Sequence, residues 1–206
     1  MKFSWLAAAL VGFSAASVLA SWQIQSIETT SDFRGLCVVS PTVAWTSGTK
    51  GTFGRTIDAG KTWGVGTVPD AEKLDFRDVE AFGTTTAYLL AAGPGEASRI
   101  YKTVDGGRSW MKQFQNADPA TFFNAMAFWD ADNGLAFGDP VQGRFALIAT
   151  NDGGAHWKQL APKTLPAALA GESAFAASGT SLVTLGDRDV WFATGGATTA
   201  RVFHSR

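Results

Sequence analysis

One eight-residue phrase occurs three times in this chain of 206 residues, and each copy starts 47 residues after the one before it. The copies are Thr56–Trp63, Thr103–Trp110 and Thr150–Trp157, with Thr first, Asp third, Gly fifth and Trp eighth in every copy. Self-similarity at such an interval indicates a repeat architecture, in which each unit is one supersecondary element that buries a face on its neighbours.

Each copy lies inside a longer unit of four short β-rich segments, bounded by Gly, Asp and Asn. The first segment opens with an aromatic residue in Phe33–Val39, Phe76–Phe82 and Phe123–Trp129, and the fourth unit has Glu172–Ala177 in its place. The second segment is apolar, the third leads into the repeated phrase, and the fourth leaves it. This pattern predicts an all-β fold of four-stranded antiparallel blades, a β-propeller, with blades near residues 33–66, 75–115, 122–160 and 172–206.

The repeated phrase has the chemistry of a tight turn between the third and fourth strands. Its Asp can accept backbone N–H groups and its Gly can adopt a positive φ, while the Trp packs between blades. Burying the indole contributes up to about 5 kcal/mol, against about 1 kcal/mol net for a turn hydrogen bond. We therefore expect structural rather than catalytic roles for Asp58, Gly60, Trp63, Asp105, Gly107, Trp110, Asp152, Gly154 and Trp157.

The first twenty residues have the pattern of an export signal. Lys2 is followed by an apolar or small run from Phe3 to Ala20, and Val18–Ala20 supplies small residues for cleavage. We expect a signal peptide over residues 1–20, a propeller domain over 21–206, and a periplasmic or extracellular location. The single cysteine, Cys37, cannot form an internal disulfide and is expected to be a buried small hydrophobe. The net charge of −1 does not favour nucleic acid as a partner.

The repeats resemble the Asp-box, or BNR, repeat of sialidase-type β-propellers. Phe128–Pro140 and Ala44–Gly51 further resemble bacterial proteins related to the photosystem II stability/assembly factor. The second resemblance covers nearly all of residues 22–206. It implies an exported, non-enzymatic scaffold that binds another protein, without a cofactor and without a membrane span after cleavage of the signal.

Both ends of the chain resemble parts of a blade. Trp22–Gln25 is similar to Trp157–Leu160, and Arg201–Arg206 is similar to Arg99–Val104. Residues 22–28 are therefore expected to be the outer strand that completes the last blade and closes a ring of four. The favoured alternative is a piece of a larger propeller, because proteins with repeats of this family usually carry more blades.

Arg34 and Arg77 are the candidate binding residues. Each follows the first Phe of a blade's inner strand, so both are expected at the central channel, where two guanidiniums could bind a carboxylate such as a partner's C-terminus. The alternative is a structural role, bridging blades to carbonyls or to Asp78 and Glu80.

The alternative functions are a sialidase-type glycoside hydrolase, complete only in a longer chain, and a carbohydrate-binding propeller. Phe33–Leu36 partly resembles the arginine signature of sialidases. The tyrosine nucleophile that sialidases place late in the chain is not found, since Tyr88 and Tyr101 are the only tyrosines. No catalytic residue is therefore expected.

Metal ligation is not expected either. Asp130–Gly134 superficially resembles the start of a calcium loop, but it lacks the downstream Glu and lies between two strands, where such residues form a turn. His156 and His204 have no partner at ligand spacing.

Overall fold

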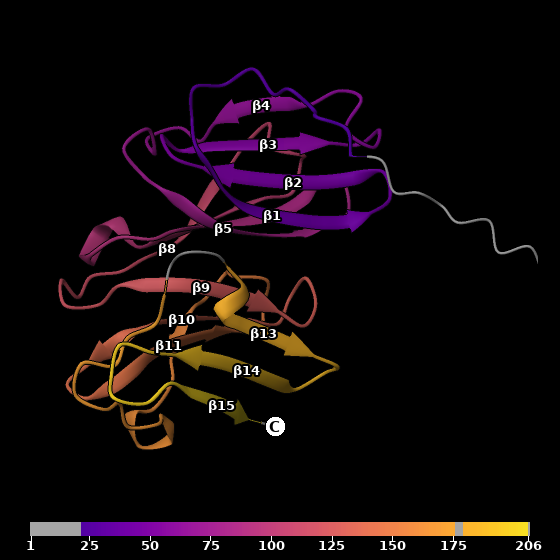
Figure 1. The fold of residues 1–206 in the computed structure, drawn as a ribbon. Helices are drawn as coiled ribbons and strands as arrows, with labels where there is room; N and C mark the ends of the chain where they lie inside the picture. The colour runs from indigo at the N-terminus through magenta and orange to yellow at the C-terminus, as the bar shows by residue number, and fades with distance from the viewer. Residues whose placement is uncertain (1–21, 176–178, 206) are drawn as a thin grey trace, which may run out of the picture.

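The computed structural model describes residues 22–175 and 179–205, so the expected signal peptide lies outside the described residues. The described chain is almost entirely β-structure, arranged as four small sheets in a β-propeller (Figure 1). The strands are β1 (Phe33–Ser40), β2 (Val43–Gly48), β3 (Thr52–Thr56), β4 (Gly64–Thr67), β5 (Phe76–Phe82), β6 (Thr86–Ala91), β7 (Arg99–Thr103), β8 (Met111–Gln115), β9 (Phe123–Phe128), β10 (Gly134–Val141), β11 (Arg144–Thr150), β12 (Lys158–Gln159), β13 (Leu182–Leu185), β14 (Asp189–Thr194) and β15 (Arg201–Ser205). Three short 3-10 helices are η1 (Gly95–Ala97), η2 (Pro162–Thr164) and η3 (Gly179–Ser181).

The sheets follow the chain in order and have antiparallel neighbours throughout. Three of them contain four strands, in the orders β1-β2-β3-β4, β5-β6-β7-β8 and β12-β11-β10-β9, and the last contains β13-β14-β15. We call these blades 1 to 4. The predicted fold class is confirmed, and the repeated phrases connect the third strand to the fourth in blades 1, 2 and 3.

The inner strand of blade 4 is not where the sequence pattern placed it. It lies at β13, and the segment predicted for this strand, Glu172–Ala177, forms only an isolated bridge between Ser173 and Gly195 among its described residues. The Glu172 carboxylate is buried and accepts hydrogen bonds from Arg201 Nε (2.9 Å) and the Leu169 N–H (2.8 Å). A buried carboxylate needs such partners, so this segment anchors a loop instead of forming an edge of the channel.

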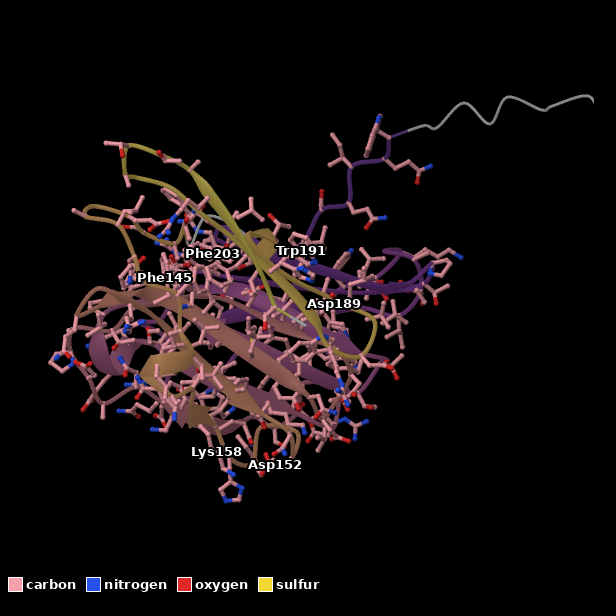
Figure 2. All side chains as sticks on the ribbon, turned by 90° about the horizontal axis from the view of Figure 1, so that it is seen from below. Phe145, Asp152, Lys158, Asp189, Trp191 and Phe203 are labelled. Atoms are coloured by element: carbon pink, nitrogen blue, oxygen red, sulfur yellow. The ribbon has the colours of Figure 1, made fainter. Side chains whose placement is uncertain are left out.

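The prediction that residues 22–28 close the ring is wrong in this structure. They form no strand, and Gln25 lies against blade 1, where its Nε2 donates to Ala59 O (3.2 Å) and its Oε1 accepts from Trp63 Nε1 (3.1 Å). Trp22 and Ile24 are each 98% exposed. Figure 2 shows the indigo N-terminal segment extending away from the sheets. In the described part of the chain, no helix has the length and apolar character needed to cross a membrane.

Three apolar clusters hold the blades together, one at each junction. Trp45 and Phe76 belong to the cluster between blades 1 and 2, and Tyr88 and Phe128 to the cluster between blades 2 and 3. The third cluster, between blades 3 and 4, contains the aromatic rings of Phe137, Phe145 and Phe192, which meet in tilted and edge-to-face contacts. Successive inner strands β1, β5, β9 and β13 contact one another and surround the space that we call the channel.

Cys37 packs against the first cluster. Burial, followed by the charge of Glu80, raises the pKa of its thiol to about 11. The thiol therefore stays protonated and packs as a small apolar group.

Candidate functional site

The three repeated phrases form the same turn. In the first, Asp58 Oδ1 accepts hydrogen bonds from the Thr62 N–H and the Thr56 hydroxyl, both at 2.9 Å, and Oδ2 accepts from the Thr62 hydroxyl at 2.6 Å. The Gly60 N–H donates to Thr56 Oγ1, and Gly60 has a φ of +81°. The second copy repeats this pattern with Asp105, Ser109, Thr103 and Gly107.

The third copy keeps the geometry with a different donor. His156 Nδ1 lies 2.7 Å from Asp152 Oδ2, in the place of the Thr or Ser hydroxyl, while the His156 N–H donates to Asp152 Oδ1. Gly154 has a φ of +81° and its N–H donates to Thr150 Oγ1. These hydrogen bonds hold the pKa of each Asp at about 2, so the carboxylates are ionised acceptors committed to their own turns.

The two candidate arginines meet at one carboxylate. Arg34 and Arg77 are the second residues of β1 and β5, and Asp75 lies just before β5. Arg77 Nε donates to Asp75 Oδ2 at 2.9 Å, and Arg34 Nε lies 3.6 Å from Asp75 Oδ1. Asp75 Oδ1 is buried and accepts no hydrogen bond from the described residues. The described ion pairs of both arginines are with Asp75, an acid that the structural alternative did not name.

The two guanidiniums and the carboxylate together carry a formal charge of +1. The Arg34 side chain is 42% exposed and the Arg77 side chain 34% exposed, so both groups reach solvent. A partly exposed pair of this kind is suited to a carboxylate ligand, because guanidinium groups recognise carboxylates through paired N–H donors. We call Arg34, Arg77 and Asp75 the arginine site.

The arginine site adjoins a hollow of about 450 Å³ within the channel. Arg34 to Val38 of β1, Asp78 to Glu80 of β5, Gly179 and Thr180 of η3, and Leu182 and Val183 of β13 line it. The hollow is therefore bounded by blades 1, 2 and 4, although these strands are far apart in the sequence.

Two acidic side chains on the channel wall have raised pKa values. Asp78 is buried, and its Oδ1 and Oδ2 accept the N–H groups of Val79 (2.9 Å) and of Met126 (2.8 Å) on β9. Burial raises the pKa of Asp78 to about 7. Burial and the nearby Asp78 raise the pKa of Glu80 to about 8. Asp78 joins blade 2 to blade 3, and it packs so closely on Gly179 that a side chain there would clash.

The sequence reasoning missed Asp75, although a signal was present. The tripeptide Asp-Phe-Arg occurs at Asp32–Arg34 and again at Asp75–Arg77. A repeated acid two residues before each candidate arginine favours an ion pair, since alternate residues of a strand share a face. The structure joins both arginines to the second of these acids.

The remaining sequence candidates lie in structural positions. Asp130 Oδ1 accepts the N–H groups of Asp132 (2.7 Å) and Asn133 (2.8 Å), as expected of a turn. The Tyr88 hydroxyl lies within hydrogen-bond distance of the carbonyls of Ala131 and Gly153, where it ties blade 2 to blade 3. In residues 22–175 and 179–205, no three His, Cys, Asp or Glu side chains form a group that could hold a metal ion.

Solved structures with a similar fold include two of YCF48. The structure of YCF48 bound to D1 peptide has a TM-score of 0.55 and 19% identity, over 89% of this chain and 56% of that one. YCF48 from Cyanidioschyzon merolae has a TM-score of 0.50 and 20% identity, over 90% of this chain and 59% of that one. This chain thus spans between half and two thirds of the length of the YCF48 chains that it matches.

A second group consists of glycoside hydrolases. The GH74 xyloglucanase from Xanthomonas campestris has a TM-score of 0.52 and 16% identity, over 80% of this chain and 25% of that one. No protein-family model and no curated protein sequence matches this chain. At these identities the likeness concerns the fold alone. The chain is therefore similar in fold to both YCF48 and GH74 propellers, which agrees with the resemblance to photosystem II assembly factors drawn from its sequence.

Proposed function

We propose that this protein is an exported, non-enzymatic scaffold that binds a segment of another protein at the arginine site. The observation that carries the proposal is the convergence of two partly exposed guanidiniums on one carboxylate, beside a hollow that Arg34 lines. The fold likeness to a YCF48 structure that contains a bound D1 peptide supports a peptide as the kind of ligand.

A free peptide C-terminus fits this site best. Its carboxylate can replace or share the partners of Asp75, while the rest of the segment extends into the hollow bounded by β1, β5 and β13. The channel wall itself offers a carboxylate no favourable site, because Asp78 and Glu80 are acidic and Asp78 is already hydrogen-bonded. Arg34 is thus the residue that connects charge recognition to the space for a ligand.

The test uses peptides with either a free or an amidated C-terminus, drawn from exported proteins of the same source. We expect the free acid to bind at least tenfold more tightly than the amide, because one charge-assisted pair contributes about 1.5–3 kcal/mol. Arg34→Ala combined with Arg77→Ala should abolish this preference. Arg108→Ala, on the exposed turn of blade 2, is the matched control. Equal binding of acid and amide, or binding unaffected by the double change, would contradict the proposal.

A glycan is the second candidate ligand, favoured by the likeness to GH74 propellers. Titration with xyloglucan oligosaccharides separates the two candidates. Saturable glycan binding without any peptide binding would favour a carbohydrate-binding propeller, and turnover of the glycan would contradict a non-enzymatic role.

Export is part of the proposal, supported by the pattern of residues 1–20. N-terminal sequencing of protein recovered outside the cytoplasm should begin at Ser21. Recovery of protein that still begins at Met1 would contradict cleavage of a signal peptide.

A further inference from the structure

A groove between blades 3 and 4 has a volume of about 660 Å³. Its apolar lining comes from both blades: Trp129, Leu135, Leu147 and Leu160 on one side, Phe192 and Phe203 on the other. It lies beside β15, which pairs with β14 on one edge and with no strand on its other edge in the described residues. Apolar walls beside an open strand edge are the features of a strand-docking site.

The two complete junctions show what occupies this position elsewhere in the molecule. The Trp of each repeated phrase lies on the second and third strands of the preceding blade. Trp110 packs against Trp45 on β2 and Phe53 on β3, with ring centroids 6.5 Å and 5.0 Å apart. Trp157 packs in the cluster that contains Tyr88 on β6 and Ile100 on β7.

Strand register identifies the equivalent positions in blade 3. In the second strand of each blade, one residue pairs with the first Thr of the phrase. The residue that follows it is Trp45 in β2, Tyr88 in β6 and Leu135 in β10. In the third strand of each blade, the residue three positions before the first Thr of the phrase is Phe53 in β3, Ile100 in β7 and Leu147 in β11. Leu135 and Leu147 both line the groove and are smaller than Trp45 and Phe53. The groove therefore lies at the position that the Trp of a repeated phrase fills at the other two junctions.

The chain carries a segment that matches this site. Trp22–Gln25 resembles Trp157–Leu160, which begins with the phrase's Trp and continues as the fourth strand of blade 3. Trp22 and Ile24 are 98% exposed, which is unusual for side chains of this size and marks them as available to a partner. In its own molecule the segment is held at blade 1 through Gln25, on a different blade from the groove.

We propose that the groove between blades 3 and 4 binds Trp22–Gln25 of a second copy of this chain. The exchanged segment pairs antiparallel with β15 and inserts the Trp22 indole between the blades. By the register of blade 3, Gln23 lies opposite His204 and Ile24 opposite Phe203. Two copies that exchange segments reciprocally form a closed dimer, with one filled groove in each.

The first test is the native mass of the purified protein from about 1 to about 100 µM. We expect a concentration-dependent dimer, a dissociation constant raised at least tenfold by Trp22→Ala, and a smaller effect of Trp22→Phe. Leu185→Ser is the matched control, since Leu185 is 71% exposed on β13 and does not line the groove. A dimer that is lost with Leu185→Ser and kept with Trp22→Ala would overturn the proposal.

The second test uses a labelled peptide of residues 21–27 and the Trp22→Ala protein, in which the groove is intact. The peptide should bind with an anisotropy change, and the same peptide with Ala in place of Trp should bind at least tenfold more weakly. Added to the unmodified protein, the Trp peptide should dissociate the dimer. A protein that stays monomeric throughout the concentration range would overturn the proposed exchange between two copies. If that monomer still bound the peptide, the groove would be a docking site for a strand of a different partner.

Discussion

At the scale of single residues, the unusual feature is the pair of acids on the channel wall. Asp78 has backbone donors for both oxygens, whereas Glu80 is partly buried and accepts no hydrogen bond among the described residues. Burial is the first cause of the raised pKa of each, and Asp78 adds to the raised pKa of Glu80. The channel wall therefore gains negative charge as the pH rises through about 7 and 8.

This charge predicts how stability depends on pH. Glu80 has a pKa of about 8 in the folded protein, and its usual value of 4.5 applies when unfolded, so the unfolded state loses its proton first. The free energy of unfolding should thus fall between about pH 4.5 and pH 8, by up to about 5 kcal/mol for this group at about 1.4 kcal/mol per pKa unit. Glu80→Gln should make the profile of the melting temperature against pH flatter, with Asp78 retaining part of the slope.

The control for this change is the exposed Glu96→Gln, which should leave the profile as it is. Parallel profiles for the unmodified protein and Glu80→Gln would show that Glu80 does not titrate in the folded state as argued here.

At the scale of elements, turns of the same geometry contribute differently to the free energy of unfolding, because different side chains surround the Trp of each turn. Trp110 and Trp63 occupy the same position of the same phrase. The Trp110 indole contacts Trp45 and Phe53 of blade 1, whereas Trp63, on the first blade, donates to Gln25 Oε1 and makes no aromatic ring contact among the described residues. The Trp at this position stabilises the protein only where a preceding blade receives it.

Alanine substitutions at these two positions should therefore differ. We expect Trp110→Ala to lower the free energy of unfolding by about 3 kcal/mol, since it leaves a cavity between two blades. Trp63→Ala should lower it by about 1 kcal/mol or less, as expected for a partly exposed side chain. Denaturant unfolding monitored by circular dichroism measures both, and equal losses would contradict the role of the blade junction.

At the scale of the whole molecule, stability is distributed unevenly along the row of blades. Blades 2 and 3 each pack on two neighbours, whereas blades 1 and 4 leave exposed apolar side chains, among them Leu36 and Val38 on β1 and Val183 and Leu185 on β13. Repeat proteins gain much of their stability from such nearest-neighbour interfaces. Among the described residues, blade 4 has in addition three strands and an open edge at β15.

Hydrogen exchange of the native protein should follow this order. Amides of β6 and β10 should be the most protected and exchange only by global unfolding, whereas amides of β14 and β15 should exchange through local opening at lower free energy. Peptide-resolved mass spectrometry measures the difference. Uniform protection across the four blades would mean that the molecule unfolds as a single cooperative unit.

The turns and the fold class could be predicted from the sequence because their chemistry is local. In each repeated phrase, the Asp carboxylate, the hydroxyl or imidazole and the positive-φ glycine lie within six residues of the first Thr, so their spacing alone specifies the turn. The period of 47 residues then indicates blades, since each unit must bury a face on the next. The prediction for the inner strand of blade 4 was wrong. Glu172–Ala177 has the spacing of an inner strand, but the buried carboxylate of Glu172 needs the hydrogen bond from Arg201.

Only the tertiary structure decided the rest, because charge pairing and burial depend on residues far apart in the chain. It joined Arg34 to Asp75 across two blades, and it buried Asp78 against Met126 and Gly179 so that its pKa rises. It also placed Trp22 in solvent, and among the described residues no Trp of a repeated phrase lines the groove beside β15. A repeat specifies what each unit is, whereas the energy of a contact between units depends on which side chains the neighbouring blade presents.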